Sequence, residues 1–331
     1  AAKMLSVDPQ NTVASAKRIL GRASAELESD LNLILTNEEV PAFETAQGRK
    51  TSVEVAADIL RTLRDRAESQ ISDTIFGAVI TVPAYFDDAQ RQATRQAAEL
   101  AGLKVLRLLN EPTAAAVAYG LDEQVEESSV LAVYDLGGGT FDISILRMCS
   151  GLFEVLSTGG DSALGGDDFD RDIAKKILLE SGIYKPTVSQ YRASLNLARR
   201  AKEDLSSNLA TCINLDVLGG LCGSFEFSRE MLEGLLEPYI AKTLDACRRA
   251  VFDANVESVD RVVLVGGSTR IPAVFRGVES FFGKHPISYL NPDLVVSMGA
   301  ARQADVLVGN RADSQALLLD VIPLSLGLET Y

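Results

Sequence analysis

The chain has 331 residues and a formal net charge of −14; 47% of its residues are hydrophobic and 24% are charged. Its length allows two ordinary domains or one large unit of two lobes, and its composition is typical of a soluble globular protein. No apolar run reaches the roughly 18–20 residues that span a bilayer, and the acidic balance argues against an extended nucleic-acid surface. We therefore expect no membrane and no nucleic acid as partners. The start of the chain, AAKMLSVDPQ, lacks the features of a signal peptide, so we expect a cytoplasmic protein.

The cysteines and the histidine limit the possible chemistry. Cysteines 149, 212, 222 and 247 show no C-x-x-C spacing, so we expect free thiols and no zinc site. The single histidine, His285, lies in a Gly-Lys-His-Pro turn, so Ser–His or Cys–His nucleophilic catalysis is not expected. Proton transfer is left to carboxylates, lysine or water.

The first half of the chain is predicted to alternate helices and strands, because its apolar residues recur at helical spacing or in short runs between caps and breakers. An acidic stretch from Asp122 to Glu127 follows, and we expect a boundary between two lobes there. The predicted elements are a helix from Asn11 or Thr12 to Gly21, a helix over 53–69, a strand over 77–82, a helix from Asp87 or Asp88 to Gly102, a strand over 104–109 and a helix from Pro112 to Gly120.

The second half continues this alternation, which predicts α/β architecture. At its end, the apolar cluster Leu317, Leu318 and Leu319 stands before Asp320 without a predicted helix around it, so we interpret it as a docking linker. The predicted elements are strands over 130–134 and 141–146, helices over 168–180 and 189–206, a hairpin turning at Gly219 and Gly220, a helix over 229–255, a strand over 262–265, a helix from near Pro272 and a helix over 295–308.

The clearest chemical signal is the string Asp135-Leu-Gly137-Gly138-Gly139-Thr140-Phe-Asp142. Three glycines between two apolar strands let the backbone turn tightly and approach a phosphate, and Thr140 adds a hydroxyl. The alternative is a hairpin with a flexible glycine turn. Neither the Walker pattern nor the GxGxxG pattern is present, so the prediction is a β-hairpin phosphate loop.

The two carboxylates of this loop require a cation. Asp135 and Asp142 would repel a triphosphate unless positive charge lies between them, and Mg²⁺ suits a site with one or two carboxylates and phosphate oxygens. The pattern therefore predicts metal-dependent phosphoryl transfer in which charge neutralisation is the main catalytic effect.

This loop resembles the second phosphate loop of the actin-like ATPases, which include actin, hexokinase and the DnaK-type chaperones. The strings that begin at Val82, Asn110, Gly160, Val265 and Leu317 are similar to motifs of DnaK-type heat-shock chaperones, in the order of that family. The string GDSALGGDDFD from Gly160 is more similar to the HscA branch. The resemblance implies an α/β, actin-like ATPase fold: two lobes with mixed sheets flanked by helices around a central nucleotide cleft.

The resemblance also implies roles for single residues. Glu111 would hold a metal-bound water and position the attacking water, although a helix-start acid is the alternative. Asp135 and Asp142 would face Mg²⁺ and K⁺, and Thr140 the γ-phosphate. Asp293 would be peripheral in the adenosine pocket, with a turn or cap acid as its alternative. The residues implied to contact ATP or ADP are Gly137, Gly138, Gly139, Thr140, Gly165, Gly166, Lys202, Ser206, Gly267, Ser268, Arg270 and Asp293. Those implied to relay signals to a peptide-binding domain are Pro83, Arg91, Leu317, Leu318, Leu319 and Asp320.

The sequence departs from the family on the helix that carries Lys202 and Ser206. Arg199 stands where the family usually has Glu, and Glu203 where it often has Arg. Losing the guanidinium that stacks on the adenine should weaken nucleotide binding by roughly 1 kcal/mol or more.

The family's first phosphate loop, D-x-G-T-T, is expected before residue 9 and is absent. Lys3 is the candidate for the family's catalytic lysine, although its spacing to Thr12 is one residue short; the alternative is a solvated terminus. We expect the parent protein to be an ATPase and this chain alone to hydrolyse little ATP. The expected divisions are 1–52 (outer lobe I), 53–127 (inner lobe I), 128–166 with 256–311 (inner lobe II), 167–255 (outer lobe II) and 312–331 (linker and start of the peptide-binding domain).

The resemblance implies a chaperone ATPase module that couples nucleotide state to client binding, in the maturation of iron–sulfur proteins. Its partners would be a J-domain co-chaperone similar to HscB and a client similar to the scaffold IscU, held by a peptide-binding domain absent from this sequence. Two alternatives remain: a small-molecule kinase of the same fold, and a nucleotide-sensing or docking fragment without hydrolysis.

Overall fold

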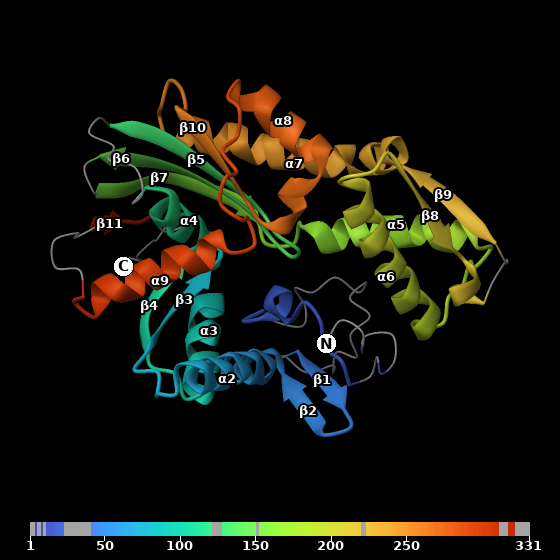
Figure 1. Cartoon of the computed structure of the whole chain (residues 1–331), viewed down its shortest axis with the longest axis horizontal. Helices are drawn as coiled ribbons and strands as arrows, with labels where there is room; N and C mark the ends of the chain where they lie inside the picture. Colours follow the sequence, from blue (N-terminus) through green and yellow to red (C-terminus); the bar gives the residue numbers. More distant parts are fainter. Residues whose placement is uncertain are drawn as a thin grey trace, which may run out of the picture.

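The computed structural model describes residues 4, 8, 11–22, 41–120, 128–149, 152–219, 223–310 and 317–321 (Figure 1). Lys3, Gly220 and Cys222 lie outside these residues. Of the helices in these ranges, none combines the length and apolar character that a membrane crossing needs. The helices, with η for 3-10 helices, and the strands are η1 (Ala16–Ile19), β1 (Ala42–Thr45), β2 (Gly48–Thr51), α2 (Ser52–Ile71), β3 (Ala78–Val82), α3 (Asp88–Leu100), β4 (Val105–Asn110), α4 (Glu111–Gly120), β5 (Ser129–Leu136), β6 (Phe141–Cys149), β7 (Leu152–Asp161), α5 (Gly166–Glu180), α6 (Val188–Leu205), β8 (Ala210–Asn214), η3 (Asp216–Leu218), β9 (Ser224–Ser228), α7 (Arg229–Asp253), β10 (Arg261–Val265), η4 (Gly267–Arg270), α8 (Pro272–Phe282), α9 (Val295–Leu307) and β11 (Leu317–Leu319).

A five-stranded mixed sheet lies in the upper body in Figure 1, in the order β10-β5-β6-β7-β11. β5, β6 and β7 are antiparallel neighbours in sequence, whereas β10 and β11 come from distant parts of the chain and pair in parallel with β5 and β7. The register of β5 and β6 sets Asp135 opposite Asp142, next to the turn that joins the two strands.

Helices cover both faces of this sheet, because its central strands are apolar on both sides. Along β5, Tyr134 and Leu136 belong to a core that α5, α6, α7 and α8 complete, and Leu131 and Val133 belong to a second core with α4 and α9. Side chains alternate between faces along a strand. Asp135 therefore shares the face of Leu131 and Val133, and this face is the one that α4 covers.

The lower body in Figure 1 contains the parallel pair β3-β4 with α2 and α3 beside it. The predicted start of α3 is confirmed: Asp87 accepts the backbone N–H of Gln90 at 2.8 Å, and the Gln90 side chain accepts that of Asp87 at 3.1 Å. α4 and α9 pack against each other between this pair and the large sheet. Their backbones approach so closely at Gly299 that a Cβ atom there would lie 1.8 Å from the carbonyl oxygen of Ala114.

Most predicted helices and strands are confirmed within a few residues, but the helix from Asn11 or Thr12 to Gly21 is wrong, because only η1 forms there. Ser15, just before η1, has a φ of 55°, which a right-handed helix excludes. The side chains of Asn11 and Thr12 bond to Asp8 instead, and such contacts compete with helical hydrogen bonds. The sequence patterns also miss β1, β2 and β7.

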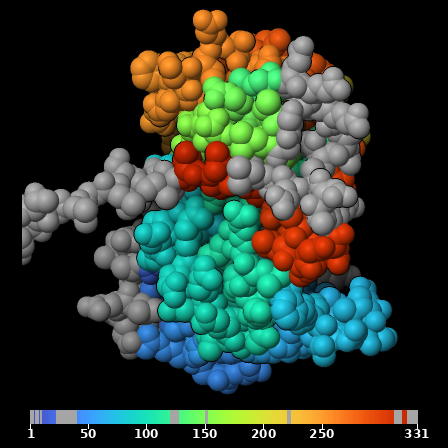
Figure 2. Space-filling model, turned by 90° about the vertical axis from the view of Figure 1, so that its left-hand side faces the viewer, coloured from blue at the N-terminus to red at the C-terminus, as the bar shows by residue number. Residues whose placement is uncertain are grey.

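The C-terminal described residues pack onto the sheet. β11 pairs in parallel with β7; Leu318 is 8% exposed, whereas Leu319 is 46% exposed. In Figure 2 the red C-terminal residues lie between the green strands of the upper body and the teal elements of the lower body. The apolar cluster is therefore docked in this structure, and its role in coupling stays a prediction.

Candidate functional site

The glycine turn between β5 and β6 rests on the N-terminus of α5. The backbone N–H of Gly166 donates to the carbonyl of Gly137 at 2.9 Å, and that of Asp167 donates to the carbonyl of Gly138 at 2.7 Å. A Cβ atom on Gly165 would lie 2.6 Å from the carbonyl oxygen of Gly138, so no larger residue fits without displacing the turn. The structure thus brings the two predicted glycine groups together as one backbone surface.

Residues from α6 and η4 complete this surface. Lys202 Nζ donates to the carbonyl of Gly166 at 2.9 Å, and Ser268 Oγ donates to the carbonyl of Gly137 at 3.0 Å. A Cβ atom on Gly166 would lie 2.7 Å from Ser268 Oγ and 3.1 Å from Lys202 Nζ. Gly138 is exposed and Thr140 is partly exposed, so both remain accessible to a ligand. The N–H groups of Gly166 and Asp167 already bond to the turn, so the exposed turn itself, near the positive end of the α5 dipole, is the part of this surface that suits an anion such as phosphate.

Three predicted carboxylates lie beside this turn. Asp135 and Asp142 are opposite each other on β5 and β6 and are 7% and 1% exposed. Glu111 is the first residue of α4, which covers the same face of the sheet. Asp142 is held by the loop after β3, where the backbone N–H of Tyr85 donates to Asp142 Oδ1 at 3.0 Å.

The two aspartates have raised pKa values. Burial and, after it, the charge of Glu111 raise the pKa of Asp142 to about 7. Burial, Glu111 and Asp142 raise the pKa of Asp135 well above its usual range. Both shifts show that negative charge is unfavourable at this position unless a cation accompanies it.

One cation of the chain already faces this group, and the sequence analysis missed it. Lys17 lies on η1, and its Nζ is 2.5 Å from Glu111 Oε1. The Lys17 side chain is 48% exposed. Desolvation lowers the pKa of Lys17, but the charges of Glu111, Asp135 and Asp142 outweigh it, and the net shift is upward. Lys3, the predicted catalytic lysine, lies outside the described residues. The signal that was available is the Ala16-Lys17-Arg18 string, four residues after Thr12 of the predicted Asn-Thr cap.

These residues fit a magnesium-bound nucleotide better than a metal held by protein alone. Within the described ranges, no group of three or more His, Cys, Asp or Glu side chains is arranged to hold a metal ion. Mg²⁺ usually keeps several waters and needs few carboxylates when phosphate oxygens are present. The two buried carboxylates and the glycine surface beside them provide that combination.

Of the predicted adenosine-side residues, Gly267, Ser268 and Arg270 cluster in η4 and Asp293 pairs with it, whereas Lys202 and Ser206 belong to α6 and its C-cap. Gly266, just before η4, has a φ of 84°, and a Cβ atom there would lie 2.3 Å from the carbonyl oxygen of Leu136. Gly267 begins η4, and Arg270 ends it and pairs with Asp293 at 2.8 Å; the two side chains of this pair are about half exposed. Ser206 is the C-cap of α6, where its hydroxyl donates to the carbonyl of Lys202.

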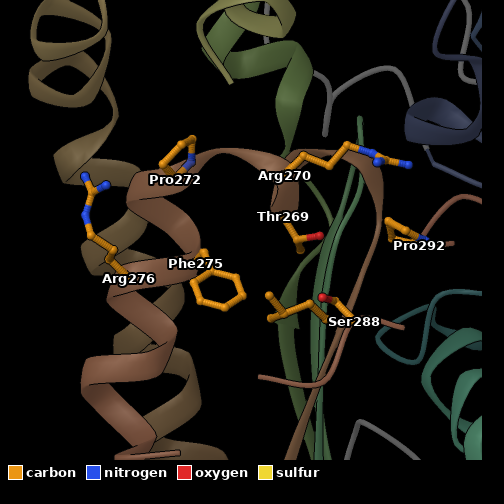
Figure 3. A pocket seen from close by; sticks show the side chains of 8 residues that line it. Thr269, Arg270, Pro272, Phe275, Arg276, Ser288 and Pro292 are labelled. Atoms are coloured by element: carbon orange, nitrogen blue, oxygen red, sulfur yellow. The ribbon is translucent and has the colours of Figure 1, made fainter. Parts of the chain in front are cut away.

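A cavity of about 390 Å³ borders this cluster (Figure 3). Phe275 and Ser288 lie across from each other in it, and Arg270 extends away from Phe275 toward the segment that carries Pro292. There Arg270 donates to Asn291 at 3.0 Å as well as to Asp293. The guanidinium is thus held beside η4, at the edge of the cavity.

The departure at Arg199 has a structural consequence. Arg199 on α6 pairs with Asp167 at 2.9 Å and with Asp170 at 3.1 Å, both on α5. Asp170 also pairs with Lys202 at 2.7 Å. Arg199 therefore joins the two helices that flank the glycine surface, and Glu203 is exposed.

The predicted relay residues also meet near the carboxylates. The Arg91 guanidinium donates to the backbone carbonyls of Ala84 and Phe86, in the loop that follows Pro83. Desolvation lowers the pKa of Arg91, and the negative charge of Asp320 opposes this shift only in part. Asp320 accepts the side-chain N–H of Asn110 at 2.9 Å and the hydroxyl of Thr113 at 3.3 Å. The docked segment therefore holds the first turn of α4, which begins with Glu111.

The comparisons with known proteins cover the whole chain. The Hsp70 protein family matches residues 1–331. The protein named Chaperone protein HscA homolog from Vibrio cholerae serotype O1 (strain M66-2) is 54% identical over 330 residues, which are 98% of this chain and 52% of the relative. Proteins of the same name from Haemophilus influenzae (strain PittGG) and Pseudomonas putida are 52% and 53% identical, over 98% of this chain and 52% and 53% of their own lengths. The chain therefore spans about half the length of these curated relatives.

Proposed function

The chain belongs to the Hsp70 family, and we propose that it is the ATP-binding and ATP-hydrolysing module of a molecular chaperone. The observation that carries this proposal is the buried pair Asp135 and Asp142 beside a glycine surface, with Glu111 and Lys17 facing the pair. This arrangement combines a backbone cradle for phosphates with carboxylates that need cations. It suits phosphoryl transfer from a nucleotide to water.

In this proposal the residues of the turn bind the phosphates. Backbone N–H groups of Gly138 and Gly139 contact phosphate oxygens, and the hydroxyl of Thr140 contacts the γ-phosphate. Gly137, Gly165 and Gly166 shape the backbone surface on which the phosphates lie. Mg²⁺, when bound with the nucleotide, supplies neutralising charge between phosphates and carboxylates. Asp135 and Asp142 would face Mg²⁺ and, as a further part of the proposal, K⁺, and their carboxylates would offset the charge of these cations.

Glu111 and Lys17 act on the water that attacks the γ-phosphate. The Glu111 carboxylate accepts a hydrogen bond from that water and orients it for in-line attack. Lys17 pairs with Glu111 and adds positive charge near the phosphate oxygens. On the adenosine side, Lys202, Ser206, Gly267, Ser268, Arg270 and Asp293 form the nucleoside contacts that we propose.

The docked segment suggests how nucleotide state reaches a client. Asp320 is bonded to the first turn of α4 and faces Arg91, so closure around a nucleotide and docking of residues 317–320 act on the same helix end. We propose that this contact, with Pro83 and Arg91, couples ATP binding to client release. The division into lobes at residues 52, 127, 166, 255 and 311 is part of this proposal.

The HscA names of the relatives suggest a role in iron–sulfur protein maturation. On that basis we propose a J-domain co-chaperone similar to HscB and a client similar to the scaffold IscU, bound by the parent protein. A cytoplasmic location stays a prediction. Because the chain spans half of each relative, the whole protein's activity is tested best in the parent protein.

Calorimetry of ADP binding, with and without Mg²⁺ and K⁺, tests the proposed function. We expect metal-dependent binding that Asp135→Asn removes, and we expect K⁺ to strengthen it. In the parent protein, the same substitution should lower phosphate release from ATP by at least about 100-fold, the effect typical of losing a main electrostatic group. Equal binding by the wild type and Asp135→Asn would contradict the assignment of this site, and absence of binding in both would indicate a docking fragment.

A further inference from the structure

Arg18 connects three elements that are far apart in the sequence. Its side chain is 7% exposed; Nε donates to the carbonyl of Gly139 at 3.0 Å, while Nη1 and Nη2 donate to both carboxylate oxygens of Asp168, with Nη1 at 3.3 Å. Asp168 lies in the first turn of α5 and is 6% exposed. One buried guanidinium thus joins η1, the glycine turn and the start of α5.

Two further contacts run between the same segments. The hydroxyl of Ser15, the residue before η1, donates to the Asp167 carboxylate at 2.5 Å. Arg22, three residues after η1 ends, donates to the hydroxyl of Ser162. Ser15 adopts its left-handed conformation at this point. Residues 15–22 are therefore attached at three positions to residues 162–168 of the upper body, and Arg18 is the central and most buried attachment.

Arg18 is adjacent to the lysine that faces the carboxylates. Lys17 extends to Glu111, and Arg18 extends to the glycine turn and Asp168. A rigid, two-pronged contact such as Arg with a carboxylate fixes both position and orientation, which a lysine at the same place cannot do. A Cβ atom on Gly139 would lie 3.3 Å from Arg18 Cγ and Nε, so the side chain packs directly on the turn.

We propose that Arg18 is a positioning residue for nucleotide binding: its contacts with Gly139 and Asp168, here called the Arg18 clamp, hold η1 against the glycine turn. The clamp keeps Lys17 at Glu111 and fixes the carbonyl of Gly139, so that the N–H groups of the turn face the phosphates. Opening the clamp lets residues 15–22 move away and release the nucleotide. This inference rests on the proposed function, and it identifies the contact that sets the lifetime of the bound nucleoside diphosphate.

The test compares Arg18→Lys with Arg171→Lys. Arg171 also pairs with Asp168, but both residues lie on α5, so this ion pair does not join separate segments of the chain. The dissociation rate of a fluorescent N-methylanthraniloyl-ADP, loaded with Mg²⁺, is measured by stopped flow. We expect Arg18→Lys to release the nucleotide about tenfold faster, the effect of losing one or two buried hydrogen bonds, with little change in association rate. Arg171→Lys should change release less than about twofold.

A second measurement needs no nucleotide. Amide hydrogen exchange over residues 11–22 and 137–140 should be faster in Arg18→Lys and unchanged in Arg171→Lys. If Arg18→Lys gives too little folded protein, Asp168→Asn tests the same contact from the other side, and it should accelerate exchange over both ranges.

The outcomes separate this inference from the proposed function. Equal nucleotide release from the two arginine variants would overturn the clamp and leave the proposed function standing. Failure of the wild type to bind the ADP analogue would count against the proposed function, and the exchange measurement would then decide the clamp alone. If the amides of residues 137–140 exchange as slowly in Arg18→Lys as in the wild type, the Arg18 clamp is overturned.

Discussion

Asp135 and Asp142 lie directly opposite each other on β5 and β6, and both side chains are almost fully buried. Two carboxylates in this arrangement disfavour each other's ionisation, so the site destabilises the chain in the absence of a cation. Local instability of this kind is typical of a binding site that a charged ligand completes.

We therefore expect Asp142→Asn to stabilise the chain without ligand, by on the order of 1–3 kcal/mol at pH 8. The folded-state pKa of Asp142 is raised to about 7, so the folded chain binds this proton more tightly than the unfolded chain. The destabilisation is absent below about pH 4 and complete above about pH 7, so the gain should shrink at pH 5. Urea unfolding at pH 5 and pH 8 measures it. The exposed Asp253→Asn should show no such pH dependence, and a loss of stability in Asp142→Asn at pH 8 would contradict the electrostatic account.

Replacing Lys17 with methionine should have the opposite effect on stability. The substitution removes the cation that faces Glu111, Asp135 and Asp142; because the Lys17 side chain is 48% exposed and screened by solvent, we expect a loss of about 0.5–1 kcal/mol without ligand. In the parent protein it should also reduce ATP turnover at least about 100-fold. Thermal unfolding and phosphate release measure the two effects. Lys242→Met on the exposed side of α7 is the control, and full turnover in Lys17→Met would exclude a role for Lys17 in hydrolysis.

The contact between α4 and α9 predicts a large effect of a single methyl group. In Gly299→Ala the added Cβ would lie 1.8 Å from the carbonyl oxygen of Ala114, so the helices must separate, at a cost of about 3 kcal/mol or more. Gly234→Ala in α7 is the matched control, because nothing lies within 4 Å of its added Cβ. That variant should gain about 0.5–1 kcal/mol from helix propensity. Chemical denaturation compares the two, and similar stabilities would show that the helices adjust freely.

The cysteines should differ in reactivity toward iodoacetamide. Cys247 is buried and burial raises the pKa of its thiol, whereas Cys212 is exposed. Because the thiolate is the reactive form, we expect Cys212 to be alkylated in the native chain and Cys247 only after unfolding. Peptide mass spectrometry before and after addition of urea measures both sites. Native labelling of Cys247 at a rate near that of Cys212 would show that α7 opens locally.

We expect docking of β11 to depend on the buried side chain of Leu318 and not on the exposed side chain of Leu319. Leu318→Asp places a charge in the core beneath β7 and should release residues 317–320, whereas Leu319→Asp, at an exposed position, should leave them docked. Hydrogen exchange over residues 152–154 and 317–320 reports the difference. Equal protection in the two variants would mean that the backbone pairing with β7 is sufficient for docking.

Much of the fold follows from local patterns. The capping pair of Asp87 and Gln90 fixes the start of α3 within one turn of helix, and the glycine turn between β5 and β6 is a contiguous string whose neighbours are apolar strands. Such features depend on residues a few positions apart, so their prediction needs no knowledge of the rest of the chain. The same reasoning fails at residues 11–21, where helical spacing suggested a helix, because side-chain bonds to Asp8 and the conformation of Ser15 outweigh periodicity.

The sequence by itself determined the α/β class and the glycine turn with its two flanking carboxylates, because these lie within short stretches whose hydrogen bonding and burial are set locally; phosphate binding by this turn stays a prediction. Only the tertiary structure decided which cations face that loop. Lys17 and Arg18 reach Glu111, Gly139 and Asp168 because η1 is held between the two bodies of the molecule, and β11 reaches β7 by pairing across most of the chain. Contacts of this kind depend on how the cores of the sheet, α4 and α5 pack against one another, and no spacing along the chain encodes that packing.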